Sequence, residues 1–174
     1  LVYASRNIDS VVIGRFFGAE ALGFYNRAFQ LMLLPLNQIN APASRVALPT
    51  LSRLQDDPRR YAEFVSFGQT VLLNIVAFVL GICAAQASAI IALSLGPQWA
   101  ATVPLFQILA FAGFFQAASY ATFWVFTSLG RTTSMLWYTL ATRPVAIVII
   151  ASGAVWGVEG VAWMYLVATA LMWP

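Results

Sequence analysis

Residues 24–60, FYNRAFQLMLLPLNQINAPASRVALPTLSRLQDDPRR, decide how this chain folds. The stretch is apolar enough to enter a lipid bilayer, yet it carries Pro35, Pro42 and Pro49 at intervals of seven residues. Each proline removes one backbone N–H and frees the carbonyl four residues earlier. An unpaired carbonyl in hydrocarbon costs several kcal/mol. The stretch therefore predicts a helix with one side against other helices or a wet cavity, away from lipid.

The chain as a whole is strongly apolar. Hydrophobic residues make up 61% of its 174 residues, and charged residues only 9%, against about 25% in a soluble domain. No charged residue occurs in residues 64–130, a run much longer than the roughly 20 residues that one spanning helix needs. Gly96 and Pro97 mark a turn inside that run, and Trp99 beside them suits a membrane surface. We therefore expect an all-α, polytopic membrane helical bundle.

The charged residues exclude several classes of function. The net charge of +3 comes from nine arginines, with no lysine and no histidine. The absence of histidine excludes histidine-based catalysis and histidine metal ligation in this chain. The absence of lysine excludes a P-loop lysine and a lysine Schiff base. The arginines are dispersed among apolar segments, so we expect no nucleic-acid partner. The single Cys83 is interpreted as a small buried residue, and we expect no metal and no cofactor.

Six hydrophobic segments are predicted, with the first and the last truncated. The chain begins at Leu1 without a methionine and stops within an apolar run, so we expect an internal fragment of a longer membrane protein, forming a single bundle. The second segment would be roughly 50 Å long as a helix, more than a bilayer core of about 30 Å, so it should tilt, bend or protrude. The expected segments are residues 1–17, 21–54, 60–87, 101–129, 134–155 and 160–174.

The arginines between segments predict an orientation. The connection between the second and third segments holds Arg53, Arg59 and Arg60, and the connection between the fourth and fifth holds Arg131. The alternate loops at 96–99 and 157–160 carry no arginine. Because positively charged loops stay in the cytoplasm, the arginine-bearing loops are predicted to be cytoplasmic.

Polar residues recur every seven positions along the second segment. Such a repeat drifts only about 20° per step around a straight helix, so these residues should form one stripe. Arg6 and Asp9 stand three residues apart on the first segment and should share a face. Placing an ionisable group in a membrane costs at least about 2.5 kcal/mol, which makes each one a functional candidate. The candidate cavity residues are Arg6, Asp9, Arg27, Gln30, Asn37, Gln38 and Arg45, and Ser44 and Ser52 complete the stripe.

Structural explanations compete with a binding role at each position. Arg6 and Asp9 would also form a simple ion pair, and Arg27 and Arg45 would also snorkel to the outer and inner membrane surfaces. The amides would also bond neighbouring helices or the freed carbonyls. Together, however, arginines and amides on a proline-bent helix suit an anionic, hydroxyl-rich ligand. Guanidinium groups bind phosphate or carboxylate as a fork, and amides bond sugar hydroxyls.

Three stretches resemble the polysaccharide-transporter branch of the MOP flippase superfamily, which includes Wzx-type flippases. They are RNIDSVVIGRFFGAEALGFYNRAFQLMLLPLNQINAPASRVALPTLSRLQDD (6–57), LSLGPQWAATVPLFQILA (93–110) and GVEGVAW (157–163). The resemblance implies two pseudo-symmetric helical bundles around a central cavity, with this chain similar to the opening part of the second bundle and the first bundle missing. It implies no enzyme activity and no bound metal.

The same resemblance implies a function. Members move undecaprenyl-diphosphate-linked oligosaccharides across the bacterial inner membrane by alternating access, for lipopolysaccharide or exopolysaccharide biosynthesis. Lipid-linked oligosaccharide and membrane lipids are then the expected partners. Arg6, Arg27 and Arg45 would meet the diphosphate or an acidic sugar. Asp9 would couple transport to an ion or a proton, or would hold Arg6.

Other membrane functions remain open on the sequence. A drug or cation exporter of the MATE type usually needs an acidic cavity, whereas the spans here contain more arginines than carboxylates. A membrane-embedded polysaccharide polymerase generally relies on large extramembrane loops, and every loop expected here is short. A structural subunit would explain helix packing but not the polar stripe.

Overall fold

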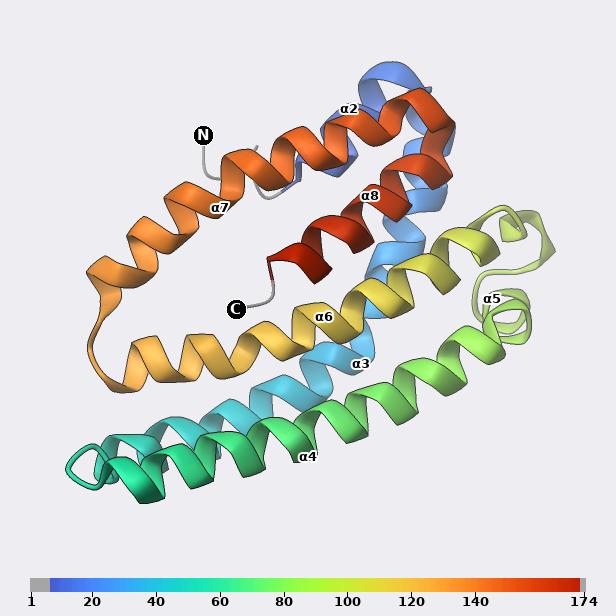
Figure 1. Ribbon diagram of the computed structural model, residues 1–174. Coiled ribbons are helices and arrows are strands. Elements are labelled where there is room, and N and C mark those ends of the chain that lie inside the picture. The colour runs from blue at the N-terminus through green and yellow to red at the C-terminus, as the bar shows by residue number, and fades with distance from the viewer. Residues whose placement is uncertain (1–6, 173–174) are drawn as a thin grey trace.

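The computed structural model describes residues 7–172, and every regular element within them is helical (Figure 1). The all-α prediction is confirmed. The α-helices are α2 (Ile8–Phe16), α3 (Gly18–Arg53), α4 (Pro58–Ala85), α5 (Ala87–Ser94), α6 (Thr102–Ser128), α7 (Thr132–Ser152) and α8 (Gly157–Leu171). Two 3-10 turns, η1 (Pro97–Trp99) and η2 (Gly153–Trp156), lie in the connections before α6 and α8.

Three helical stretches are long and apolar enough to cross a membrane: Pro58–Ala85, Thr102–Ser128 and Thr132–Leu171. The last contains α7 and α8, which fold back on each other at η2 (Figure 1). The chain is therefore a polytopic helical membrane bundle. How α2 and the polar, proline-containing α3 sit in the bilayer stays a prediction.

Glycines at two sharp reversals allow the chain to fold back. Gly18 separates α2 from α3 with φ 84°, and Gly157 separates η2 from α8 with φ 83°. Side chains other than glycine are strained in this left-handed region. The α2–α3 and α7–α8 connections can therefore reverse the chain without a long loop.

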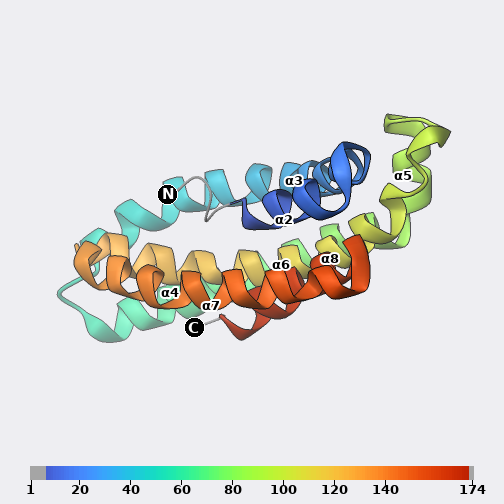
Figure 2. The same ribbon diagram turned by 90° about the horizontal axis from the view of Figure 1, so that it is seen from above.

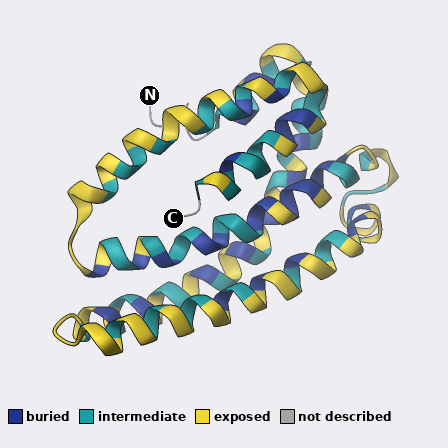
Figure 3. Ribbon diagram, in the orientation of Figure 1, coloured by how far each residue is buried: buried dark blue, intermediate teal, exposed yellow. Residues whose placement is uncertain are grey.

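The helices form two layers. Figure 2 shows α2 and α3 lying over the layer that contains α6, α7 and α8. Helix α6 is central, since it packs most extensively on α3, α4 and α8, and it carries more buried residues than any other described helix (Figure 3). Close approach depends on small residues: a Cβ added at Gly113 would lie only 2.8 Å from the Met32 sulfur. Small residues at helix contacts are typical of membrane bundles.

The connections gather at two ends of the bundle (Figure 1). The α3–α4 and α6–α7 connections share one end, which we call the arginine end because Arg59, Arg60 and Arg131 lie there. The α2–α3, α5–α6 and α7–α8 connections share the opposite end, called the tryptophan end after Trp99 and Trp156. This alternation is the one that the orientation prediction requires.

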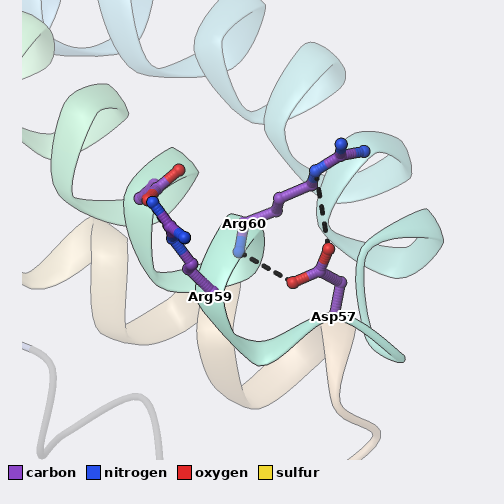
Figure 4. A network of polar contacts seen from close by, with 4 residues as sticks. Asp57, Arg59 and Arg60 are labelled. Carbon is purple, nitrogen blue, oxygen red and sulfur yellow. Dashed lines mark hydrogen bonds and ion pairs between the residues drawn. The ribbon is translucent and has the colours of Figure 1, made fainter.

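At the arginine end, charged side chains organise the start of α4 (Figure 4). The Asp57 carboxylate accepts a hydrogen bond from the Arg60 backbone N–H at 3.1 Å and forms an ion pair with the Arg60 side chain at 3.5 Å. Arg59 pairs with Glu63 at 3.0 Å. These groups are exposed, and exposed pairs contribute at most about 1 kcal/mol. The cluster therefore caps a helix at a solvated surface.

Helices α3 and α6 run parallel and are joined by polar contacts toward the arginine end. Trp124 Nε1 donates to Ser44 Oγ at 2.8 Å. Beyond it, the Gln55 side chain donates to the Ser128 backbone carbonyl, and Tyr61 shares a hydrogen bond of 2.7 Å with the Ser128 hydroxyl. The Trp124–Ser44 bond restrains the rotation of α3 about its axis and so helps to decide which of its side chains point outward. The contacts of Ser128 hold the α3–α4 connection and the start of α4 against the end of α6.

Candidate functional site

The predicted stripe on α3 lies on the outward side of the helix. Arg27, Gln38 and Arg45 are separated by whole numbers of helical turns, so they lie in one line. The buried residues of α3, among them Met32 and Leu36, are on the opposite side, against α6. We call the outward side the polar face of α3. Its exposed polar residues are Arg27, Gln30, Asn37, Gln38, Arg45 and Ser52.

Backbone carbonyls add to this polarity. Helix α3 runs unbroken through its three prolines, and Pro42 and Pro49 deprive the carbonyls of Gln38 and Arg45 of their helical partners. Both residues lie on the polar face. An unsatisfied carbonyl and an exposed arginine are costly against hydrocarbon. The polar face must therefore meet water, another part of the protein or a polar ligand.

Arg27 is held in place at the tryptophan end. Its Nη1 donates to Gln30 Oε1 at 3.1 Å. Its guanidinium carbon lies 5.7 Å from the centre of the Trp99 ring, and Phe24 packs edge-on against the same ring with centroids 5.5 Å apart. A cation–π contact at an exposed site contributes about 0.5–1 kcal/mol. Arg27 is thus oriented along the face rather than left free.

Two further polar residues of α3, Ser44 of the predicted stripe and Asn40, do not take part in this face. Ser44 is half-buried and accepts the hydrogen bond from Trp124, so it belongs to the α3–α6 contact. Asn40 is buried, and its side-chain oxygen and nitrogen have no hydrogen-bond partner among the described residues. Nothing in the described structure explains that amide.

Asp9 occupies a different place from the other predicted site residues. Only 4% of it is exposed, and its Oδ2 accepts a hydrogen bond from the buried Tyr25 hydroxyl at 2.8 Å. A second bond, from Ser10 to Asn26 at 3.1 Å, also joins α2 to α3. Arg6 lies outside the described residues, so its pairing with Asp9 stays a prediction. The structure thus separates Asp9 from the polar face and places it inside the bundle.

Asp9 lines a cavity of about 350 Å³ between α2, α6, α7 and α8. We call it the inner cavity. Polar side chains line it from all four helices. Its polar lining includes Asp9, Gln116, Ser119, Thr142, Arg143 and Tyr165.

The walls of the inner cavity are rich in hydrogen-bond acceptors. Thr139 and Thr142 each donate their hydroxyl hydrogen to a carbonyl of α7 at 2.8 Å, and Thr169 does so within α8. The lone pairs of these oxygens remain available. Gln116 Oε1 is buried and has no hydrogen-bond partner among the described residues. The cavity therefore offers acceptors, together with the donor-only guanidinium of Arg143.

Sequence reasoning missed Arg143 and Gln116. The sequence does contain a signal for Arg143, because this arginine lies inside an apolar segment and directly precedes Pro144. Arg27 and Arg45, which were selected, likewise lie on a segment that contains proline. Gln116 had none, because one amide in a long apolar helix is compatible with any rotational setting. Only the packing of α6 on its neighbours points Gln116 into the cavity.

Comparison with known proteins now adds to this geometry. A family model described as "Polysaccharide biosynthesis protein" matches residues 1–104, which include α2, α3, α4 and α5. The chain belongs to the polysaccharide biosynthesis protein family. The matched residues include Asp9 and the whole polar face of α3. Most residues that line the inner cavity come after residue 104 and lie outside the match.

Individual relatives agree with the family. The chain is 39% identical over 108 residues to the teichuronic acid biosynthesis protein TuaB of Bacillus subtilis, covering 62% of this chain and 22% of TuaB. It is 26% identical over 148 residues to the amylovoran biosynthesis protein AmsL of Erwinia amylovora, covering 85% and 38%. It is 28% identical over 116 residues to the lipopolysaccharide biosynthesis protein WzxC of Escherichia coli, covering 64% and 23%. No solved structure is significantly similar.

These matches assign the chain to a multi-pass membrane protein with a role in polysaccharide biosynthesis. The aligned parts span well under half of each relative named above.

Proposed function

We propose that the protein containing this chain is a flippase of the bacterial inner membrane. It would translocate undecaprenyl-diphosphate-linked oligosaccharide by alternating access, as a transporter and not as an enzyme. The observation that carries the proposal is the polar face of α3, an uncovered line of arginines, amides and freed carbonyls in a membrane bundle of a polysaccharide biosynthesis family. A lipid-linked oligosaccharide combines the diphosphate and the hydroxyls that these groups bind.

The spacing of the two arginines supports a path for the cargo. Arg27 and Arg45 lie five helical turns apart, about 27 Å along the axis, close to the roughly 30 Å of a bilayer core. Gln30, Asn37 and Gln38 lie between them on the same face. A guanidinium at each end would attract the diphosphate, while the amides would exchange hydrogen bonds with sugar hydroxyls along the way.

The uncovered position of this face also suggests a partner within the same protein. Since the polar face must not meet lipid, a second helical bundle across a water-filled space would account for it. In this proposal the chain supplies the opening part of one bundle, the first bundle lies opposite, and membrane lipids surround α4 and α7. No metal and no cofactor take part.

The test is flipping by the full-length protein in proteoliposomes. A fluorescent undecaprenyl-diphosphate oligosaccharide is incorporated, and the fraction protected from an external quencher is followed over time. Removing both arginines (Arg27→Ala with Arg45→Ala) should slow flipping at least tenfold, because the diphosphate loses a cation at each end of the path. The matched control is Arg59→Ala, which removes an exposed arginine outside the polar face. Equal flipping by the double variant and the control would exclude this path.

A further inference from the structure

We propose that the inner cavity binds one acidic sugar unit of the cargo, with Arg143 recognising its carboxylate. This inference rests on the proposed function and names a second binding site, distinct from the polar face of α3. The two sites differ in kind: the polar face is an open surface, whereas the inner cavity is walled by four helices.

The size of the cavity limits the ligand. Pockets for small ligands measure about 300–1,000 Å³, and the inner cavity, at about 350 Å³, lies at the small end of this range. One sugar ring with its substituents matches such a volume. A complete oligosaccharide or a diphosphate-linked lipid does not, so the cavity would hold a single unit while the remainder lies outside.

The acceptor atoms of the inner cavity favour a ligand with hydroxyl groups. Gln116 Oε1 has no partner although it is buried, and a buried acceptor without a partner costs about 1–3 kcal/mol. The hydroxyls of Thr139, Thr142 and Thr169 donate to carbonyls of their own helices, so toward a ligand they can act only as acceptors. Sugar hydroxyls are donors that satisfy all of these atoms at once.

The charges set the direction of the ligand. Arg143 lies about midway along α7, and both ion pairs found among the described residues are at the arginine end, away from it. Arg143, Asp9 and Tyr165 all line the inner cavity. The Oδ2 atom of Asp9 already accepts a hydrogen bond from Tyr25 of α3. A sugar carboxylate would therefore bind Arg143 on the α7 wall, while its hydroxyls turn toward Asp9.

Aromatic side chains supply the remaining wall. Phe126 and Tyr138, with ring centroids 6.4 Å apart, join α6 to α7 beside the cavity. Tyr165 lines the cavity from α8. Rings of this kind offer flat apolar surface together with a polar hydroxyl, which matches the two chemically different sides of a pyranose.

The experiment measures protection of a cysteine in the cavity of the full-length protein. Ser119→Cys is labelled with a maleimide in the presence of methyl glucuronide or methyl glucoside, which differ only in the carboxylate. Ser88→Cys, exposed on α5 and outside the cavity lining, is the control. Glucuronide should protect Cys at position 119 at concentrations at least tenfold lower than glucoside, without protecting position 88.

Arg143 variants then identify the recognition. Arg143→Gln should abolish the preference so that both sugars protect equally, and Arg143→Lys should restore part of it. Equal protection by both sugars in the unmodified protein, or a preference that survives Arg143→Gln, would overturn the inference. So would protection by sodium ions with no effect of either sugar. Flipping assays on the same preparation separate the two ideas, because flipping that depends on Arg27 and Arg45 upholds the proposed function whatever the cavity binds.

Discussion

The outward faces of α3 and α4 show two different kinds of membrane-protein surface. Both belong to long helices that pack on α6 with one side. The uncovered side of α4 is mainly apolar, with exposed Phe67, Ile75, Phe78 and Ile82, and its exposed Thr70 and Asn74 donate to carbonyls of their own helix. The uncovered side of α3 instead carries arginines and amides. The bundle therefore has two kinds of outward surface: one suits contact with lipid, and the other would be costly to expose to lipid. This asymmetry agrees with the proposed transporter of two bundles.

The largest expected effect comes from placing the same charge on each face. Ile75→Arg on α4 should cost about 2.5–3.5 kcal/mol of membrane insertion, because the guanidinium would enter hydrocarbon. Leu34→Arg should cost little, since Leu34 is 60% exposed and lies on the same side of α3 as Arg27 and Arg45. Insertion yield of the full-length protein, measured by glycosylation mapping, checks the pair. Equal losses for both variants would show that the two faces contact the same medium.

A smaller effect is expected on the packed side of α3. Tyr25→Phe removes the hydroxyl that donates to Asp9 and leaves a buried carboxylate oxygen without that partner, at a cost of about 1–3 kcal/mol. The thermal unfolding midpoint in detergent should fall. Asn37→Leu, which changes an exposed amide, is the control and should leave the midpoint nearly unchanged. The reverse result would mean that the polar face is packed against another helix and that the Asp9 contact is dispensable.

The boundary between the two sides can be tested at Ser44. Trp124→Phe keeps an aromatic ring but loses the hydrogen bond to Ser44, which should destabilise the protein by about 0.5–1.5 kcal/mol. Ser44→Ala should cost a similar amount, and the double variant should cost no more than one of the single variants, because both remove the same bond. Additive losses in chemical denaturation would show that the two side chains act independently.

The smallest expected effect concerns the end of the polar face. Trp99→Leu removes the ring under Arg27 and should cost about 0.5–1 kcal/mol, with Arg27 then less well oriented. Trp99→Phe should retain most of the contact. Flipping by the Leu variant should become more sensitive to salt than flipping by the Phe variant. Identical salt dependence would leave Trp99 as a membrane-surface residue only.

Much of the architecture was predictable because membrane helices follow simple rules. Prolonged apolar runs, turns at Gly96 and Gly157, and arginines in alternate connections are local properties of the sequence, and the all-α prediction that follows from them is confirmed. The polar stripe was predictable for the same reason, since seven-residue spacing places side chains on one side of any helix. Sequence alone did not distinguish a side covered by other helices from one left open. In the structure no described helix covers it.

The inner cavity was beyond prediction from the sequence. Its residues come from four helices, and no spacing rule relates Asp9 near the start of the chain to Arg143 on α7. The Arg6–Asp9 pair drew attention to a local neighbour, whereas the partner that the structure gives Asp9 is Tyr25, on the helix that folds back at Gly18. The predicted roles of Arg6, Arg27, Gln30, Asn37, Gln38 and Arg45 in binding stay predictions.

The sequence by itself determined that this protein is a helical membrane bundle with one polar line on a proline-containing helix, because hydrophobic length and periodicity act within a single helix. Tertiary structure decided the rest. The rotation of each helix against its neighbours decides which polar residues are buried, which remain exposed and which line a shared cavity. That rotation is set by contacts such as Gly113 against Met32 and Trp124 against Ser44, which join positions far apart in the chain.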